Sequence, residues 1–390
     1  MTSPSHALQI ADRHSHNQQA KQLLAQQVAD GCLQANVCKV TSESSTPVTI
    51  YDVARAAGVA PSTVSRTFAR PGRVNAETSA RIRKIAEEIG YRANPIGQPP
   101  SYSDTRLLGL MVSDVANPFY SQLTRGAQIA ANDAGYELLL ADARESGSRE
   151  RNALDRLVPV VEGFVIGSSR MSDSALRTIA KQRPMVVLNR ALTDIPSVVT
   201  DNVSGVHAAA DLLLELGHEA VVYVAGPEAS WADGIRFRAL RDYGTATGLY
   251  THKIGPFLPT FEGGLSAAQA LLERLPTAVI AYNDLMAVGL MHGLLCEGVQ
   301  IPEQVSVIGF DDILISRLML PTLTTVAAPT RQMGATAVNN VIALIKGAKH
   351  RTGEASVMPV QLRVRGSTAQ RRRKRVSPAL GTTMVSGSAS

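Results

Sequence analysis

The segment Val48–Arg66, VTIYDVARAAGVAPSTVSR, constrains the fold of this chain more than any other. Thr49 can cap a helix, and Asp52, three residues later, stands where the acid of a capping box belongs. Apolar residues then recur at the spacing of one helical face as far as Ala57, and Gly58 supplies a turn. The pattern predicts the first helix of a helix-turn-helix.

A second helix is expected from Pro61, which fits the first helical position because its missing N–H loses no hydrogen bond there. Val64 is its inward anchor, and the outward residues are Ser62, Thr63, Ser65 and Arg66. Short hydroxyls and one arginine suit phosphate contact and base reading in a major groove. The alternative for these residues alone is a helical hairpin with a solvated face. Asn75 is predicted to cap a third helix that ends at Gly90.

Charge is concentrated in two parts of the 390-residue chain, whose net charge is +6. Residues 47–100 hold eight Lys or Arg against four Asp or Glu, and residues 371–375 read RRRKR. The distribution is the one expected if only these two parts meet phosphate. The tail is predicted to be a disordered basic end.

Several classes of protein are disfavoured. No apolar run is long enough to span a bilayer, and the first residues lack the features of a signal peptide, so a cytoplasmic protein is expected. Cys32, Cys38 and Cys296 form no CxxC pair, which argues against a disulfide framework and a zinc cluster. His14 and His16 could bind a metal, but a solvated polar segment is the preferred reading. We expect no metal and no cofactor.

From Leu107 onward, short apolar runs alternate with helical stretches, as in parallel sheets covered on both faces. The predicted strands are 107–112, 137–141, 163–166, 185–188, 220–224, 278–282 and 305–309. The predicted helices are 121–134, 204–216, 264–274 and 285–297. Two successive sets of such units indicate two similar subdomains.

The order VTIYDVARAAGVAPSTVSR and then VNAETSARIRKIAEEIGYRANP resembles the headpiece of the LacI/GalR family of bacterial transcriptional repressors. The resemblance continues through almost all of residues 48–367. It implies an α/β fold with an N-terminal three-helix helix-turn-helix headpiece and a two-lobed domain of parallel sheets, like type I periplasmic binding proteins. The chain is then expected to cross between the lobes near Thr200, Leu323 and Thr352.

The predicted organisation has five parts. They are a disordered extension (1–46), the headpiece (47–93), a hinge or linker (94–106), an effector-binding domain (107–368) and the basic tail (369–390). Lobe one is expected at about 107–200 and 327–350, and lobe two at about 201–323 and 355–368.

The resemblance assigns operator reading to the positions of Pro61, Ser62 and Arg66. Pro61 offers no side-chain donor, so base reading should rest on Ser62 and Arg66. Ala60 stands where the family has a capping serine, which costs about 1 kcal/mol of helix stability. The full set of predicted DNA contacts is Thr49, Tyr51, Pro61, Ser62, Thr63, Ser65, Arg66, Asn75, Tyr91 and Asn94.

The linker departs from the family. Asn94 and Pro95 match the start of the family's hinge helix, but Pro99 and Pro100 interrupt it, and Pro100 stands near the place of the DNA-inserting leucine. We expect at most one hinge turn and less DNA bending.

Ligands of open parallel sheets lie at the carboxyl ends of the strands. The loops expected there are 113–120, 189–190, 201–202, 231–236, Phe257, 283–284 and 310–311. Their carboxylates, amides, arginine and aromatic rings suit a polyhydroxylated sugar or a nucleoside. The predicted effector contacts are Phe119, Tyr120, Asn189, Arg190, Trp231, Arg236, Phe257, Asn283, Asp284 and Asp311.

Four of these assignments carry alternatives or rest on the family. Asp284 alone reads as a helix cap, whereas the resemblance assigns effector binding to Arg236 and Asp284. It also assigns an aromatic cover near Phe257. Trp231 could be a packing residue instead.

No catalytic motif is found, and the adjacent pair Asp311 and Asp312 should point in different directions, so an enzyme is not expected. We predict a cytoplasmic regulator, a repressor that binds a palindromic double-stranded operator as a homodimer. A small polar effector, with a sugar or sugar derivative favoured, would control it, and no membrane partner is expected. The alternatives are a secreted sugar-binding receptor without DNA function and a purine-responsive corepressed regulator.

Overall fold

The computed structural model describes residues 49–69, 72–89, 91, 105–348 and 355–371. The chain divides into two compact units, Met1–Gly97 and Gln98–Ser390, which are described separately below. Several predictions lie outside the described residues. They concern the extension 1–46 with His14, His16, Cys32 and Cys38, the helix end at Gly90, the linker with Asn94, Pro95, Pro99 and Pro100, and the tail beyond Arg371.

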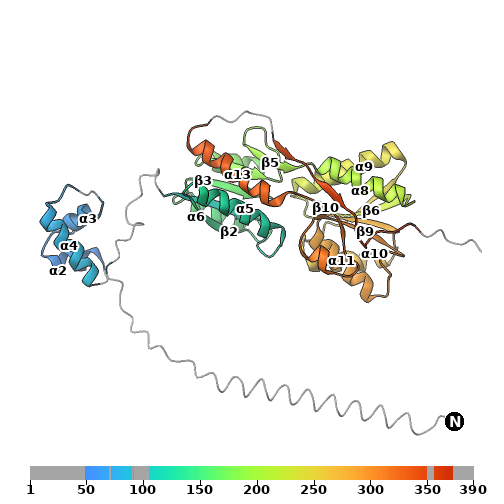
Figure 1. The fold of residues 1–390 in the computed structure, drawn as a ribbon, viewed down its shortest axis with the longest axis horizontal. Coiled ribbons are helices and arrows are strands. Elements are labelled where there is room, and N and C mark those ends of the chain that lie inside the picture. The colour runs from blue at the N-terminus through green and yellow to red at the C-terminus, as the bar shows by residue number, and fades with distance from the viewer. Residues whose placement is uncertain (1–48, 70–71, 90, 92–104, 349–354, 372–390) are drawn as a thin grey trace, which may run out of the picture. The chain divides into compact units, whose positions relative to one another are not determined.

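Three helices form the first unit: α2 (Ile50–Ala57), α3 (Pro61–Ala69) and α4 (Ala76–Glu88) (Figure 1). The Asp52 carboxylate accepts hydrogen bonds from the Thr49 N–H (2.9 Å) and the Thr49 hydroxyl (2.6 Å), and these bonds lower the pKa of Asp52. Gly58 ends α2 in the left-handed region at φ 64°. The Asn75 side chain caps α4 by accepting from the Glu77 N–H at 3.0 Å. The predicted caps are therefore present.

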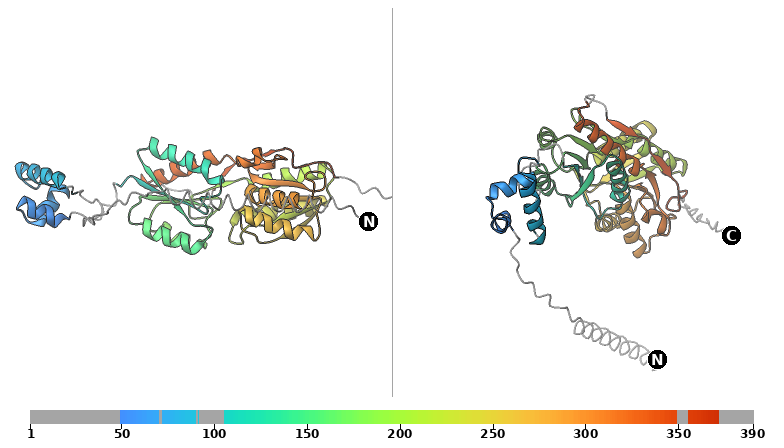
Figure 2. Two further views of the ribbon diagram at one scale, coloured as in Figure 1. Left: turned by 90° about the horizontal axis from the view of Figure 1, so that it is seen from below. Right: turned by 60° about the vertical axis from the view of Figure 1, so that its left-hand side comes forward.

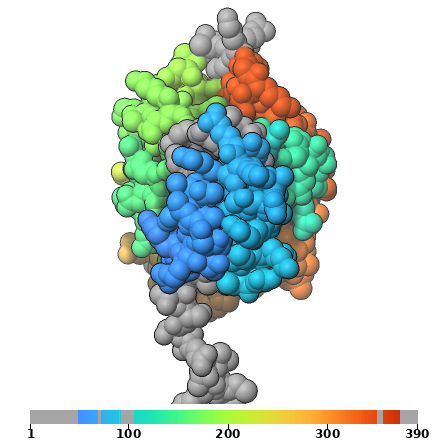
Figure 3. Space-filling model, turned by 90° about the vertical axis from the view of Figure 1, so that its left-hand side faces the viewer, coloured from blue at the N-terminus to red at the C-terminus, as the bar shows by residue number. Residues whose placement is uncertain are grey.

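One aliphatic core joins the three helices. Val53, Val64 and Ile82 are fully buried, and Ala57 and Ala86 are nearly so. Figure 3 shows α2 and α4 packed side by side in the headpiece surface, in agreement with their contacts. The expected three-helix headpiece is confirmed, because each helix supplies part of one closed core.

Lobe one of the second unit is built on a six-stranded parallel sheet in the order β11-β5-β4-β3-β1-β2 (Figures 1 and 2). Its strands are β1 (Leu107–Val112), β2 (Glu137–Asp142), β3 (Gly163–Gly167), β4 (Met185–Leu188), β5 (Ser197–Thr200) and β11 (Ser356–Met358). One face packs on α5 (Phe119–Asp133) and α13 (Thr330–Ile345), and the other on α6 (Gly147–Leu157) and α7 (Asp173–Ala180). Both faces are covered, as the continuous apolar strands predict.

Lobe two repeats this plan with the strand order β12-β10-β9-β8-β6-β7, in which only β12 pairs antiparallel. Its strands are β6 (Ala220–Val224), β7 (Tyr250–Ile254), β8 (Ala278–Ala281), β9 (Ser306–Asp311), β10 (Thr324–Ala327) and β12 (Gln361–Arg363). Helices α8 (Asn202–Glu215) and α9 (Trp231–Thr247) pack on one face, and α10 (Phe261–Leu272) and α11 (Asp284–Cys296) on the other. The short α12 (Ile315–Leu318) follows β9.

The chain crosses between the lobes three times, and two crossings fall later than expected. The first follows Thr200, as predicted. The second comes after Ala327 rather than near Leu323, because β10 still pairs with β9 in lobe two. The third comes after Met358 rather than near Thr352, because β11 pairs with β5 in lobe one. Short strands of three or four residues carry too little apolar pattern to mark these boundaries.

Among the helices of the described residues, none is long and apolar enough to cross a membrane.

Candidate functional site

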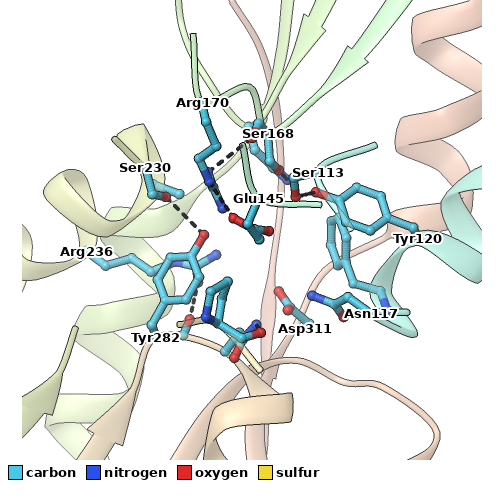
Figure 4. A pocket seen from close by; sticks show the side chains of 15 residues that line it. Ser113, Asn117, Tyr120, Glu145, Ser168, Arg170, Ser230, Arg236, Tyr282 and Asp311 are labelled. Atoms are coloured by element: carbon cyan, nitrogen blue, oxygen red, sulfur yellow. Dashed lines mark hydrogen bonds and ion pairs between the residues drawn. The ribbon is translucent and has the colours of Figure 1, made fainter. Parts of the chain in front are cut away.

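A cleft between the two lobes gathers most of the polar loops that end the parallel strands (Figure 4). Lobe one contributes Ser113, Asn117, Phe119, Tyr120, Glu145, Ser168, Arg170 and Asn189. Lobe two contributes Ser230, Ala232, Arg236, Pro259, Tyr282, Asn283 and Asp311. The space in it that the centres of water molecules can occupy is about 30 Å³, enough for about two waters in this conformation.

An ion pair dominates the lobe-one side of the cleft. The Arg170 Nε donates to the Glu145 carboxylate at 2.6 Å, and Nη1 donates to the Ser168 carbonyl at 3.1 Å. The two paired side chains are 6% and 12% exposed. Behind them, the buried Glu150 carboxylate accepts from the Arg170 backbone N–H at 2.9 Å, and burial raises the pKa of Glu150. The guanidinium is therefore held in one position.

Aromatic residues from α5 complete this side. The hydroxyls of Tyr120 and Ser113 are 2.7 Å apart, and the Tyr120 ring meets Phe119 edge to face at 5.1 Å between centroids. Burial raises the pKa of Tyr120, so its phenol is neutral and can both donate and accept. Just before α5, the Asn117 side-chain oxygen accepts from the Phe119 N–H at 3.0 Å.

Arg236 of α9 organises the lobe-two side. Its Nε donates to the Asn202 side-chain oxygen at 2.8 Å, and its Nη1 donates to the Tyr282 carbonyl at 2.5 Å. The guanidinium lies over the Phe310 ring, 3.8 Å from its centroid. Contacts in two directions therefore fix a buried cation at the cleft.

Asp311 ends β9 with its side chain in the cleft (Figure 4). Within the described ranges its carboxylate has no hydrogen-bond partner. Burial raises the pKa of Asp311 to about 7, and the nearby Arg236 opposes that shift. The carboxyl is thus an unused acceptor that a ligand can engage.

Four residues that line the cleft have strained backbone conformations with positive φ angles. Glu145, Ser168, Asn189 and Asp311 follow or end four different strands, and their φ angles are 55°, 50°, 55° and 114°. Each costs about 1 kcal/mol or more relative to an ordinary conformation. Such strain gathers at functional sites because the fold must aim particular side chains there.

The structure brings six of the predicted effector contacts together in the cleft: Phe119, Tyr120, Asn189, Arg236, Asn283 and Asp311. Two other predicted effector contacts do not line the cleft, because their side chains point elsewhere. Arg190 points away and donates to the Met171 carbonyl (2.6 Å) and to Asp173 (2.5 Å). Trp231 begins α9, and its neighbours Ser230 and Ala232 line the cleft instead.

Asp284 and Phe257 are also outside the lining. Asp284 is fully buried, and it accepts from the Thr325 hydroxyl (2.5 Å) and the Ile313 N–H (3.0 Å). Burial and the neighbouring Asp311 raise the pKa of Asp284 well above its usual value. The cap of α11 is Asn283, which accepts from the Met286 N–H at 2.9 Å. Phe257 packs against the core beside α10 and α11.

Several lining residues fall outside the loops that the sequence singled out: Glu145, Ser168, Arg170, Ser230, Pro259 and Tyr282. The first three follow β2 and β3, and both strands were predicted. Applying the carboxyl-end rule to these two strands as well would have found them.

On the headpiece, the residues expected to meet DNA divide into two groups. Tyr51, Pro61, Ser62 and Arg66 are exposed, and Thr63 and Ser65 are half-buried. Thr49 and Asn75 use their side chains in helix capping, and Tyr91 packs against Phe68 at 5.8 Å between centroids. Asn94 lies outside the described residues.

Replacing Asp311 with asparagine is expected to stabilise the protein at pH 8 by on the order of 1–3 kcal/mol and to have little effect at pH 4. The folded pKa of about 7 exceeds the ordinary value of 3.8, so wild-type stability falls as pH rises from about 4 to 7. Asparagine is neutral throughout and avoids that loss. Denaturant unfolding at pH 4, 6 and 8 measures the difference.

Asp312→Asn, at the adjacent residue, is the matched control, because the pKa of Asp312 is shifted in the opposite direction. Burial alone would raise the pKa of Asp312, but hydrogen bonds from Arg317 and Arg365 outweigh it and lower the pKa. Asp312 therefore stabilises the fold above its folded pKa, and that contribution is lost as pH falls through it. A stability difference for Asp311→Asn that does not change with pH would contradict this account.

The fold and the cleft define a class: a two-lobed small-molecule-binding domain preceded by a helix-turn-helix headpiece. Residues 49–94 match the family "Bacterial regulatory proteins, lacI family", and residues 210–368 match "Periplasmic binding protein-like domain". The HTH-type transcriptional repressor CytR of Escherichia coli (strain K12) is 32% identical over 335 residues, 83% of this chain and 97% of that protein. The regulator GalS of Salmonella typhimurium is 33% identical over 326 residues, 81% and 95% of the two chains. This chain belongs to the LacI family of DNA-binding transcriptional regulators.

Solved structures agree. A lac repressor dimer bound to operator and the anti-inducer ONPF aligns with TM-score 0.64 and 26% identity, over 83% of this chain and 99% of that one. A LacI family regulator from Enterococcus faecium with bound ribose aligns with TM-score 0.62 and 28% identity, over 68% and 100%.

Proposed function

We propose that this protein is a repressor whose affinity for a palindromic operator changes when a sugar or sugar derivative occupies the cleft. The observation that carries the proposal is that polar side chains from both lobes line one cleft. A ligand that contacts both lobes favours one angle between them, and that preference is the differential affinity that regulation requires. The ribose-bound relative and a CelR-cellobiose complex (TM-score 0.61, 27% identity) support a sugar as the effector.

We further propose that the protein acts as a homodimer in the cytoplasm, by binding alone and without catalysis. Its target, chromosomal DNA, is in the cytoplasm. Dimerisation is supported by a groove between α5, α12 and α13 that includes Ile129 of lobe one and Leu314 of lobe two. Leu314, Leu318 and Leu320 are 66%, 70% and 85% exposed, an unusual density of exposed leucine over seven residues. A second copy that covers this face would bury them.

Arg66→Ala is expected to weaken operator binding by about 1–3 kcal/mol, if Arg66 makes a bidentate base contact. Arg66 is exposed on α3, whereas Pro61 lacks a side-chain donor, so the arginine carries much of the sequence reading. The operator is first selected from a random DNA pool with the full-length protein. Affinity is then measured by fluorescence anisotropy at fixed salt.

Arg83→Ala is the control, because Arg83 is an exposed cation of the same headpiece on α4. It should weaken selected and random DNA alike, while Arg66→Ala should lower only the preference for the selected site. The selected sites should be palindromes, as a dimer requires. Equal effects of both variants on specificity would refute the assignment of Arg66.

A further inference from the structure

We infer that the effector is an uncharged molecule whose hydroxyl groups donate to Glu145 from lobe one and Asp311 from lobe two, and that the cleft rejects phosphorylated ligands. The inference rests on the proposed function, because it names the chemical class of ligand for the same cleft. It is carried by the charges of the lining residues and by the partners they already have.

Above pH 7, where Asp311 is ionised, the charges of the lining cancel. Among the described residues that line the cleft, the charged side chains are Glu145, Asp311, Arg170 and Arg236, two of each sign. That lining includes no lysine or histidine. An anion entering this space therefore meets no net positive charge to offset its desolvation.

Both guanidinium groups already use their Nε and Nη1 atoms in hydrogen bonds within the protein. Arg170 is bonded to Glu145 at 2.6 Å, in a pair that is nearly buried. A phosphate could reach Arg170 only by displacing Glu145 or by lying beside its carboxylate. Arg236 is held by Asn202 and the Tyr282 carbonyl, and its guanidinium lies over the Phe310 ring. A phosphate could therefore bind these arginines only through their remaining N–H groups, beside the Glu145 carboxylate or against the Phe310 ring, and without the Nε atom of either.

The helix N-termini at the cleft are also capped. First-turn N–H groups often bind anions. Here the Phe119 N–H donates to Asn117 (3.0 Å), the Asp233 N–H to Ser230 (3.3 Å) and the Met286 N–H to Asn283 (2.9 Å). Neutral side chains of the lining itself therefore use these donors.

The carboxylate oxygens of the cleft are the hydrogen-bonding groups that remain available to a ligand. In the described part of the chain, Asp311 has no hydrogen-bond partner and Glu145 uses only its Oε2 atom, with Arg170. Figure 4 shows the two carboxylates facing one space from opposite lobes. A polyol can donate one hydroxyl to each, and so join the lobes. The phosphate group of a fully ionised phosphate ester has no such donors and would add two negative charges to those of Glu145 and Asp311.

The test compares, at pH 8 where Asp311 is ionised, thermal stabilisation of the full-length protein by inorganic phosphate and by sodium chloride at equal ionic strength. Wild type should show no phosphate-specific rise in Tm. Glu145→Gln should gain one, because Arg170 then lacks its carboxylate. Asp155→Asn breaks an exposed pair with Arg151 on α6 and should behave like wild type. The double variant Glu145→Gln with Arg170→Gln should lose the gain.

Sugar probes extend the test. D-ribose and D-ribose 5-phosphate, and D-glucose and its 6-phosphate, are compared on wild type and Glu145→Gln. In any pair that binds, wild type should favour the uncharged sugar by about tenfold or more, and Glu145→Gln should lower that ratio. A phosphate-specific rise in wild type equal to that of Glu145→Gln overturns the inference, as does a wild-type preference for a phosphorylated sugar. Even if none of these sugars binds, the comparison of phosphate with chloride tests whether the cleft rejects phosphate. None of these measurements depends on DNA binding.

Discussion

Gly334→Ala should lower the free energy of unfolding of the effector-binding unit by about 3 kcal/mol. The added methyl group would clash with backbone atoms, and no side chain can rotate to make room for it. A Cβ atom on Gly334 would lie 2.1 Å from the Leu123 carbonyl oxygen and 3.0 Å from the Ala127 nitrogen. Both are backbone atoms of α5, so α5 and α13 would have to separate. In lobe two, Gly264 and Gly289 likewise allow close backbone contact between α10 and α11.

Gly234→Ala is the matched control for this prediction. Gly234 is an exposed helical residue of α9, and an added Cβ would meet open space. Alanine should stabilise the helix there by up to about 1 kcal/mol. Denaturant unfolding of the two variants gives the comparison. A Gly334→Ala variant as stable as Gly234→Ala would show that the two helices are not in backbone contact.

The second large effect is expected at Arg236. Arg236→Lys keeps a positive charge, yet a lysine cannot reproduce both the bonds to Asn202 and the Tyr282 carbonyl and the contact over the Phe310 ring. We expect effector affinity to fall by about 100-fold, because the cleft loses a fixed cation and leaves buried acceptors unpaired. Isothermal titration with a ligand that binds wild type measures the loss.

Arg238→Lys controls for the substitution itself. Arg238 lies on the same helix but is exposed and does not line the cleft. Its replacement should leave effector affinity unchanged. Similar affinities for Arg236→Lys and Arg238→Lys would remove Arg236 from the binding site.

The headpiece could be predicted from sequence in detail because its determinants are local. The Thr49 and Asp52 pair, Gly58 and the Asn75 cap act within one turn of chain, and all are present in the structure. In the lobes, β1, β2, β3, β4, β6, β8 and β9 were predicted because they are apolar runs. The edge strands β7, β11 and β12 were not, since their residues are largely exposed, and the interior strands β5 and β10 were missed because each is only four residues long and includes Ser or Thr.

The loops that form the candidate site could be predicted from sequence, but the directions of their side chains could not. Asn189, Asn283 and Asp311 lie at strand ends, as expected. The residue after each of them in the chain does not line the cleft. Asn283 has extended backbone and faces the cleft, whereas Asp284 starts the helix and is buried against Thr325. The Glu145 and Arg170 pair joins residues 25 apart, so only the fold reveals it.

Operator affinity measured with and without ligand shows whether occupancy of the cleft controls DNA binding. Fluorescence anisotropy of wild type, Arg236→Lys and Arg238→Lys on the selected operator is repeated with each uncharged sugar that stabilises wild type. The account predicts that one such sugar changes the operator Kd of wild type and Arg238→Lys by about fivefold or more. Arg236→Lys should still bind operator but not respond. A sugar that binds the cleft and leaves operator affinity unchanged would contradict the account, since that is the behaviour of a receptor without DNA function.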